Sequence, residues 1–350
     1  MLPHLLWSWG VTSDSPTTAA CLYVVYEHTR PRNAPMRVWL GDAESITLGR
    51  GAIRSVEAQF DHDVRTLELK IPDARMSSRH ARLMRVRGRW ILEDLGSKNG
   101  TFVGEQPAEH TPLEARTLIQ VGHTWLMFDP RAVVPAGHPL ASVHEAALDD
   151  PFATLVPHLE HEMATAREAA ARDVPVLIVG PSGPATRKIA RAIHRHNTGA
   201  GPVFLDEVGD LSPEAQADLV GAGVTVRLPP LGERTEDLGL LVARILGDHA
   251  LTPEAALALF THPWPGNARE LEDALYTALI LAADSPIDVT HLPDIDGDEE
   301  SEHPHRDELV RLLTLHRGNV GAAARAMGKA RMQMQRWMKH YALESDQFRR

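Results

Sequence analysis

The chain has 350 residues, of which 43% are hydrophobic and 24% are charged, values typical of soluble globular protein with room for two or three domains. The single cysteine, Cys21, excludes an internal disulfide framework and fits a reducing cytoplasm. The formal net charge of -11 argues against nucleic-acid binding by the whole surface. No apolar run is long enough for a membrane span, so we expect a cytoplasmic protein without a membrane partner.

Residues 21–130 form short apolar segments of alternating pattern with frequent turns between them, which predicts an all-β sandwich. Three polar motifs interrupt the pattern: LGR at 48–50, MSSRHA at 76–81 and DLGSKNGTFV at 94–103. In order and spacing these motifs resemble the forkhead-associated (FHA) domain. That family binds phosphothreonine peptides, so the resemblance implies a phosphopeptide-binding domain.

The resemblance implies roles for five polar residues at one end of the sandwich. It places Arg50 and Ser77 on the phosphate, Ser78 and Lys98 beside it, and Asn99 on the peptide backbone. A cation, hydroxyl groups and an amide suit a phosphate ester that carries nearly two negative charges. The family commonly has arginine where this chain has Ser78.

Two further residues of the motifs are expected to shape the loops. His80 would brace the loops against each other, and Gly100 would allow a tight turn. The alternative is a domain that keeps the fold but whose ligand site has decayed. The complete set of polar positions favours a working phosphothreonine site.

The central segment VPVLIVGPSGPATRKIARAIH has the order strand, loop and helix that surrounds a Walker A motif. That motif, G-x-x-x-x-G-K-[ST], needs converging backbone donors, a lysine for the terminal phosphates and a hydroxyl for Mg²⁺. Counting from Gly180, the last three positions hold Ala185, Thr186 and Arg187, and Pro184 removes one backbone donor. The sequence therefore predicts a phosphate loop that no longer binds nucleotide.

Other central motifs resemble the AAA+ domain of bacterial sigma-54 enhancer-binding activators. Asp206 and Glu207 end an apolar strand as in a Walker B site, followed by RLPPLGERTEDL (227–238) and HPWPGNARELEDAL (262–275). The family's G-A-F-T-G-A loop, its polar sensor strand and its arginine-finger segment are missing, whereas its lid sensor arginine corresponds to Arg269. The resemblance implies a degenerate nucleotide site whose remnants are Gly180, Gly183, Thr186, Asp206, Glu207 and Arg269.

Phosphoryl transfer depends almost entirely on positioning and charge stabilisation, which these losses remove. We therefore expect a degenerate AAA+ domain over residues 151–293, and a protein with no enzyme activity, no catalytic residue, no cofactor and no metal. Strands at 176–179, 203–205 and 224–228 are expected to form a small parallel sheet with a helical lid. Without the sensor strand, the two Walker strands would become neighbours.

Three stretches lack a sustained strand or helix period. Residues 1–20 are interpreted as an N-terminal extension, and the Pro-, Ala-, Gly- and His-rich residues 131–150 as a linker. Residues 294–305, DIDGDEESEHPH, are acidic and predict a second, solvated linker.

The C-terminal segment 306–345 predicts an all-α domain. Ten Arg or Lys residues against four Asp or Glu between 306 and 350 suggest a localised DNA-binding module. Helices are expected at 319–327 and 331–341, around a turn at Gly328. The apolar face of a preceding helix is predicted to contain Leu309, Leu312, Leu313 and Leu315.

This segment resembles the Fis-type helix-turn-helix that ends the same activator family. Met334, Met338 and Tyr341 repeat at helical spacing and should face the core. The residues left to face DNA are Arg331, Gln333, Arg336 and Lys339. The alternative is a helical dimerisation tail with a basic solvated face.

The fold expected from the whole chain is multidomain: an FHA sandwich, a reduced AAA+-like domain with a helical lid, and a helix-turn-helix. The expected function is that of a homodimeric transcriptional regulator that binds DNA and works without ATP hydrolysis. Its other partner would be a phosphothreonine-containing protein, either a Ser/Thr kinase or a kinase substrate. Two alternatives are an ATP-dependent sigma-54 activator and a phosphopeptide-binding signalling adaptor that never binds DNA.

Overall fold

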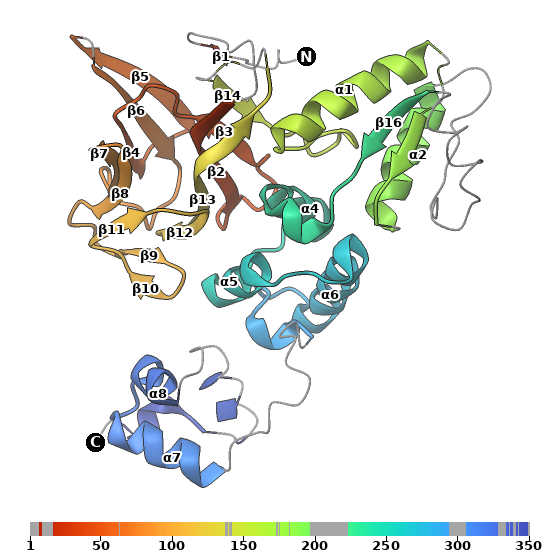
Figure 1. Ribbon diagram of the computed structural model, residues 1–350. Helices are drawn as coiled ribbons and strands as arrows, with labels where there is room; N and C mark the ends of the chain where they lie inside the picture. The colour runs from red at the N-terminus through yellow and green to blue at the C-terminus, as the bar shows by residue number, and fades with distance from the viewer. Residues whose placement is uncertain are drawn as a thin grey trace.

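The computed structural model describes residues 7–8, 17–62, 64–136, 139, 142–172, 174, 176–181, 183–196, 223–293, 306–327, 334–335, 337–338, 341 and 343–348. Two β-sheets pack face to face in its N-terminal part, as the alternating pattern predicts (Figure 1). The strand order is β1-β14-β3-β2-β13-β12-β9-β10 in one sheet and β11-β8-β7-β4-β6-β5 in the other. The strands are β1 (Trp7–Ser8), β2 (Thr17–Glu27), β3 (Met36–Trp39), β4 (Ser45–Arg50), β5 (Ser55–Asp61), β6 (Val64–Ile71), β7 (Ala81–Val86), β8 (Arg89–Asp94), β9 (Thr101–Val103), β10 (Gln106–Pro107), β11 (His110–Leu113), β12 (Thr117–Val121), β13 (Thr124–Val134) and β14 (Ser142–Glu145).

The predicted linker at 131–150 is wrong in part. Strand β13 continues to Val134, and β14 pairs with β3 at the edge of the eight-stranded sheet. The two-residue strand β1, inside the predicted N-terminal extension, pairs with β14 in turn. These pairings are long-range contacts made by short segments, so neither composition nor a local period indicates them.

A small α/β unit follows the sandwich, formed by α1 (Pro157–Ala171), β15 (Val176–Val179), α2 (Pro184–His196) and β16 (Val224–Arg227). Strands β15 and β16 pair in parallel, as expected for members of a small parallel sheet, whereas the predicted adjacency of the two Walker strands stays a prediction. The strand expected at 203–205 lies outside the described residues. Arg37 of β3 joins this unit to the sandwich, because its guanidinium donates to the Leu155 carbonyl and the Glu160 carboxylate, both at 2.8 Å.

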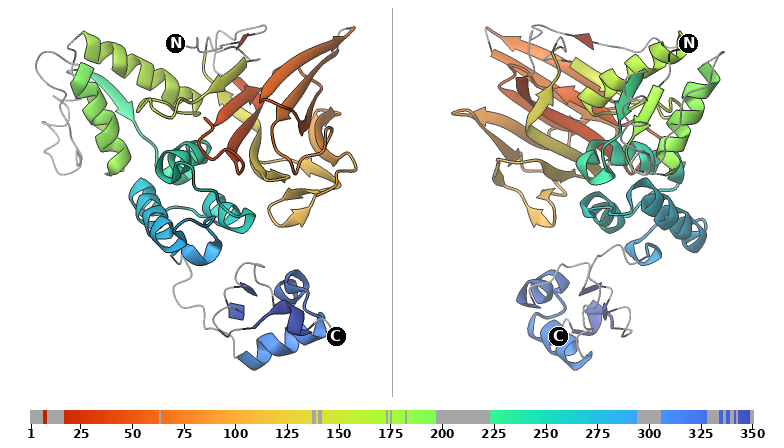
Figure 2. Two further views of the ribbon diagram at one scale, coloured as in Figure 1. Left: turned by 180° about the vertical axis from the view of Figure 1, so that it is seen from behind. Right: turned by 45° about the vertical axis from the view of Figure 1, so that its right-hand side comes forward.

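The helical lid packs against the outer face of the eight-stranded sheet. Its elements are η2 (Leu231–Glu233), η3 (Thr235–Asp237), α4 (Leu238–Leu246), α5 (Pro253–Thr261), α6 (Asn267–Ala282) and η4 (Val289–His291). Helix α5 has Pro253 in its first turn, and the Thr252 hydroxyl accepts from the Ala255 nitrogen at its N-cap, both favourable for a helix start. Both views of Figure 2 show α4 and α5 beside the sandwich.

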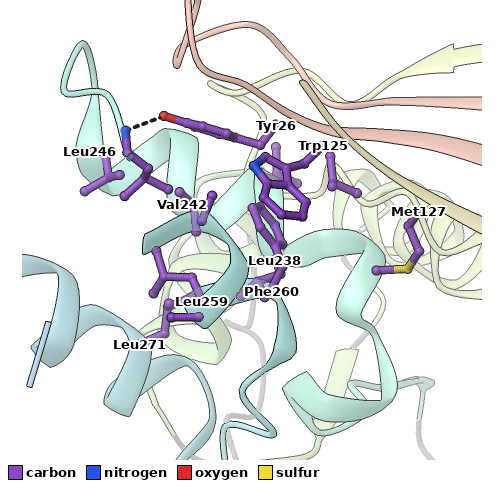
Figure 3. Close-up of a cluster of buried hydrophobic side chains, with 14 of the residues drawn as sticks. Tyr26, Trp125, Met127, Leu238, Val242, Leu246, Leu259, Phe260 and Leu271 are labelled. Carbon is purple, nitrogen blue, oxygen red and sulfur yellow. Dashed lines mark hydrogen bonds between the residues drawn. The ribbon is translucent and has the colours of Figure 1, made fainter. Parts of the chain in front are cut away.

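The sandwich and the lid share one hydrophobic core (Figure 3). Successive side chains of a strand point to opposite faces, so Leu22 faces the interior of the sandwich while Tyr23 and Val25 face the lid. Strand and helix approach so closely that a Cβ atom placed on Gly239 of α4 would lie 1.9 Å from the Val25 carbonyl oxygen. Only glycine fits this contact without displacement. The lid side chains of the shared core include Leu238, Val242, Leu246, Leu259, Phe260 and Leu271.

An ion pair crosses the same junction at its edge. Arg116, between β11 and β12, contacts the carboxylate of Glu236 at 2.7 Å and the hydroxyl of Thr235 at 3.2 Å. Burial raises the pKa of Glu236, and the charge of Arg116 opposes that rise. The sandwich and the lid therefore form one packed body, which the sequence did not predict.

The C-terminal part contains α7 (Arg306–Leu315), α8 (Val320–Met327) and η5 (Ser345–Phe348). Leu309, Leu312 and Leu313 are buried as predicted, whereas Leu315 is 67% exposed, so its assignment to the apolar face is wrong. Six residues after Leu309, a side chain lies about 120° away around the helix and leaves the buried stripe. Leu309, Leu312 and Leu313 share their core with Met334 and Met338, and Tyr341 packs against it. The predicted core positions of Met334, Met338 and Tyr341 are confirmed.

Candidate functional site

Three loops meet at one end of the sandwich. They are the end of β4, the loop at 72–80 and the loop at 95–100. The Arg50 nitrogen donates to the Ser77 carbonyl at 2.9 Å, which joins the first two loops. A Cβ atom on Gly49 would lie 2.0 Å from the Ser78 carbonyl oxygen, so glycine permits this approach.

His80 holds the second and third loops together from below. Its side chain is fully buried, and its Nδ1 accepts a hydrogen bond of 3.0 Å from the Ser77 nitrogen. Because Nδ1 accepts, the proton is on Nε2, which donates to the Gly100 carbonyl at 3.1 Å. Gly100 has a φ of 79°, a left-handed conformation that glycine adopts without strain. The bracing role expected of His80 matches these contacts.

The five residues predicted to bind phosphothreonine all lie on these loops. Arg50, Ser78 and Lys98 are exposed, while Ser77 and Asn99 are half-buried. The Ser77 hydroxyl accepts from the backbone nitrogen of Lys98 at 3.2 Å, so its own proton can be donated to a ligand. The Asn99 amide nitrogen is already used within the protein, because it donates to the Arg75 carbonyl at 2.7 Å. Its carbonyl oxygen is left to accept from a peptide N–H.

Asp94 stabilises the third loop and was missed by the sequence analysis. Its carboxylate accepts from the Ser97 nitrogen at 2.7 Å, the Ser97 hydroxyl at 2.6 Å and the Thr101 hydroxyl at 2.7 Å. Burial acts to raise the pKa of Asp94, but the hydrogen bonds from Ser97 and Thr101 lower it below its ordinary value. A signal was present in the sequence, since an aspartate at the start of a turn commonly accepts hydrogen bonds from the backbone that follows it.

In the predicted degenerate phosphate loop, polar groups form hydrogen bonds within the loop, and the loop packs against β16. Thr186, at the position of the Walker lysine, is buried, and its hydroxyl donates to the Pro181 carbonyl at 2.8 Å. A Cβ atom on Gly180 would lie 2.3 Å from the Leu228 carbonyl oxygen, so the loop abuts the end of β16. Lys188 points away from the loop, with its Nζ 3.3 Å from the Glu272 carboxylate.

The other predicted remnants of the nucleotide site are Gly183, Arg269, Asp206 and Glu207. Gly183 lies before α2, and Arg269 is exposed on α6. Asp206 and Glu207 lie outside the described residues. An open cleft of about 890 Å³ lies between α2, the lid and residues 148–153, and Lys188, Arg234 and Glu272 are among its lining residues. Neither Thr186 nor Arg269 lines it.

The residues predicted to bind DNA, Arg331, Gln333, Arg336 and Lys339, all lie outside the described residues. Over the rest of the chain, as far as it is described, no group of three or more His, Cys, Asp or Glu residues could hold a metal ion. Within the same described part, no helix is both long and apolar enough to cross a membrane.

Two family models match the chain: the FHA domain at residues 46–122 and the AAA+ ATPase lid domain at residues 232–309. A transcriptional regulatory protein of Sinorhizobium fredii is 34% identical over 157 residues, which cover 40% of this chain and 25% of the relative. The alginate biosynthesis transcriptional regulatory protein AlgB of Pseudomonas aeruginosa is 26% identical over 298 residues, which cover 53% of this chain and 66% of AlgB. The chain thus spans about a quarter of the first relative and just under two thirds of the second.

Among solved structures, an FHA domain studied for phosphothreonine-dependent interactions aligns with 32% of this chain and 96% of its own length, at 25% identity and a TM-score of 0.23. By the two family models and the regulatory relatives, the chain joins an FHA domain to an AAA+ lid domain and is homologous to the sigma-54-dependent transcriptional regulators. The expected family and the multidomain fold class are confirmed. The Fis-type nature of the C-terminal helices stays a prediction.

Proposed function

We propose that this protein is a transcriptional regulator that binds a phosphothreonine partner through its FHA domain and DNA through its C-terminal helices. It would do so as a homodimer and without ATP hydrolysis. The observation that carries the proposal is the convergence of Arg50, Ser77, Ser78, Lys98 and Asn99 on three hydrogen-bonded loops.

Hydrogen bonds within the protein fix the backbone of the loops. His80 and Asp94 make several of these bonds, so the backbone that carries Arg50 and Ser77 needs little rearrangement on binding. A preorganised site loses less conformational entropy on binding. A guanidinium with hydroxyl donors favours a phosphate dianion over an unmodified threonine.

The contacts of the phosphate loop support the absence of ATP hydrolysis. The Walker lysine position holds Thr186, whose hydroxyl is engaged by Pro181 within its own loop. Loss of the lysine removes the cation that normally reaches the terminal phosphates. The alternative of an ATP-dependent activator retains support from the match to the AAA+ ATPase lid domain.

Isothermal titration calorimetry with one peptide in phosphothreonine, phosphoserine and unmodified forms tests the proposal. The phosphothreonine form is expected to bind most tightly, and Arg50→Ala is expected to weaken it by about 2 kcal/mol through loss of a charge-assisted contact. Arg87→Asn is a matched control, because Arg87 lies in the turn between β7 and β8 at the other end of the sandwich and has a φ of 51°, which asparagine tolerates. Unchanged affinity in Arg50→Ala would place the phosphopeptide elsewhere.

A further inference from the structure

Four exposed basic residues lie on the three loops of the candidate site: Arg50, Arg75, Arg79 and Lys98. They are here called the four loop cations. The loops adjoin, because the Arg75 carbonyl accepts from the Asn99 side chain at 2.7 Å. A Cβ atom on Gly49, beside Arg50, would lie 3.5 Å from the Cα atom of Arg79. The four loop cations are therefore grouped at one end of the sandwich.

None of the four loop cations forms an ion pair within the residues that the structure describes. Most other arginines of the sandwich do. The paired arginines and their partners are Arg32 with Asp248, Arg37 with Glu160, Arg54 with Glu27, Arg65 with Asp42, Arg82 with Glu93, Arg85 with Glu44, Arg89 with Glu114 and Arg116 with Glu236. Although the protein has a net charge of -11, the four loop cations are grouped without a carboxylate paired to any of them among the described residues.

The carboxylates beneath these loops are directed inward. Asp73 is 1% exposed and accepts from the Arg75 nitrogen, the His123 nitrogen and the Thr124 hydroxyl. The carboxylate of Asp94 accepts from donors within its own loop, as described above. Both carboxylates are satisfied by uncharged donors, so they brace the loops and leave the positive charge at the surface.

A phosphothreonine carries about 1.5 to 2 negative charges at pH 7, which is fewer than the charge of the four loop cations. We propose that the partner presents its phosphothreonine in an acidic segment, with Asp or Glu residues within about three positions of the phosphate. An extended peptide advances about 3.4 Å per residue, so flanking carboxylates at those positions reach neighbouring loops. Arg75 and Arg79 would contact the flanking carboxylates, whereas Arg50 and Lys98 would contact the phosphate. This inference rests on the proposed phosphothreonine function.

Three phosphothreonine peptides that differ only in their flanks, acidic, neutral or basic, test the inference by fluorescence anisotropy with the full chain. The acidic peptide is expected to bind about tenfold more tightly than the neutral one, from two or three exposed ion pairs. The advantage is expected to shrink when the salt is raised from 0.05 M to 0.5 M, because screening shortens the range of such pairs. The basic peptide is expected to bind most weakly.

Variants distinguish the residues that contact the flanking carboxylates from those that contact the phosphate. Arg75→Gln combined with Arg79→Gln is expected to remove the preference for acidic flanks while the preference for phosphorylated over unmodified peptide is kept. Arg50→Ala is expected to reduce binding of all three peptides. Arg87→Asn, which removes one exposed cation at the other end of the sandwich, should change neither preference.

The same binding measurements distinguish failure of the acidic-segment inference from failure of the phosphothreonine function. Equal affinity for the acidic, neutral and basic phosphopeptides would overturn the acidic-segment inference and leave phosphothreonine binding intact. An acidic peptide that binds equally with and without phosphate would overturn the phosphothreonine function and support the cationic surface alone. Absence of binding by all three phosphopeptides would overturn both.

Discussion

The hydroxyl of Tyr26 in the FHA sandwich accepts a hydrogen bond of 2.7 Å from the backbone nitrogen of Leu251 in the lid. The carbonyl of the same Leu251 lies 2.7 Å from Nδ1 of His28. Two side chains at the end of β2 thus satisfy both polar backbone groups of one lid residue. Burial raises the pKa of Tyr26 well above its ordinary value, so the hydroxyl stays neutral.

Tyr26→Phe should destabilise the sandwich and the lid together. The substitution leaves the buried Leu251 N–H without its partner, which costs about 1 to 3 kcal/mol in the free energy of unfolding. Denaturant unfolding checks this, with Tyr276→Phe as a control, because Tyr276 on α6 is 51% exposed. The control should stay within about 0.5 kcal/mol of the unsubstituted protein. Equal stability of both variants would contradict the role assigned to the Tyr26 hydroxyl.

Acid should weaken this junction through His123. Burial lowers the pKa of His123, and the charge of His28, whose ring lies 4.7 Å away, lowers it further. A histidine with a depressed folded-state pKa stabilises the fold above its unfolded pKa of about 6.5 and loses that contribution as pH falls through the folded value. Unfolding free energies measured between pH 7.5 and 5 should therefore decline, and His123→Gln should flatten the decline. An identical slope in the variant would refute this assignment.

Repair of the phosphate loop should restore nucleotide binding but not ATP hydrolysis. Pro184→Thr, Ala185→Gly and Thr186→Lys rebuild the cradle and remove the bond from the Thr186 hydroxyl to Pro181. We expect weak nucleotide binding by the repaired chain, no binding by the unmodified chain, and no turnover by either, because the arginine-finger segment is missing. Calorimetry with ATP and a phosphate-release assay check this. Steady hydrolysis by the unmodified protein would instead support the ATP-dependent activator.

DNA binding should depend on the C-terminal helices. Arg331 near the start of the predicted recognition helix should reach base edges, so Arg331→Ala should relax sequence preference. Lys339, later in that helix, should meet phosphate, so Lys339→Ala should lower affinity for all sequences and reduce the salt dependence. Footprinting on a two-fold site with half-sites about one helical turn apart checks both variants. Retention of the footprint after deletion beyond Asp298 would exclude this assignment and support the adaptor.

The sequence was sufficient to predict those elements that are determined by residues close to one another in the chain. Alternating strands, the motif loops with His80 and Gly100, the separate strands β15 and β16, and the core positions Met334 and Met338 follow from period and turn chemistry. Leu315 was assigned to the buried face because it is apolar and lies close to Leu312 and Leu313 in the sequence. Its position around the helix places it outside the buried face, where it is exposed.

The junction between sandwich and lid was missed because it joins residues more than 200 positions apart in the chain, as Tyr26 and Leu251 do. One signal was available. Strand β2 contains the uninterrupted apolar run CLYVVY, which indicates a strand buried on both faces and not one with a solvated side. The run implied a cover for the outer face, but not that the lid helices supply it.

The contact of Gly239 with Val25 has a consequence for how this protein can evolve. An FHA sandwich moved by recombination into another gene without its lid would carry Tyr23, Trp125 and Met127 on an uncovered sheet face. Such a face favours aggregation, so selection would remove the transplanted gene product. The FHA sandwich and its lid should therefore be inherited as a pair in related genes.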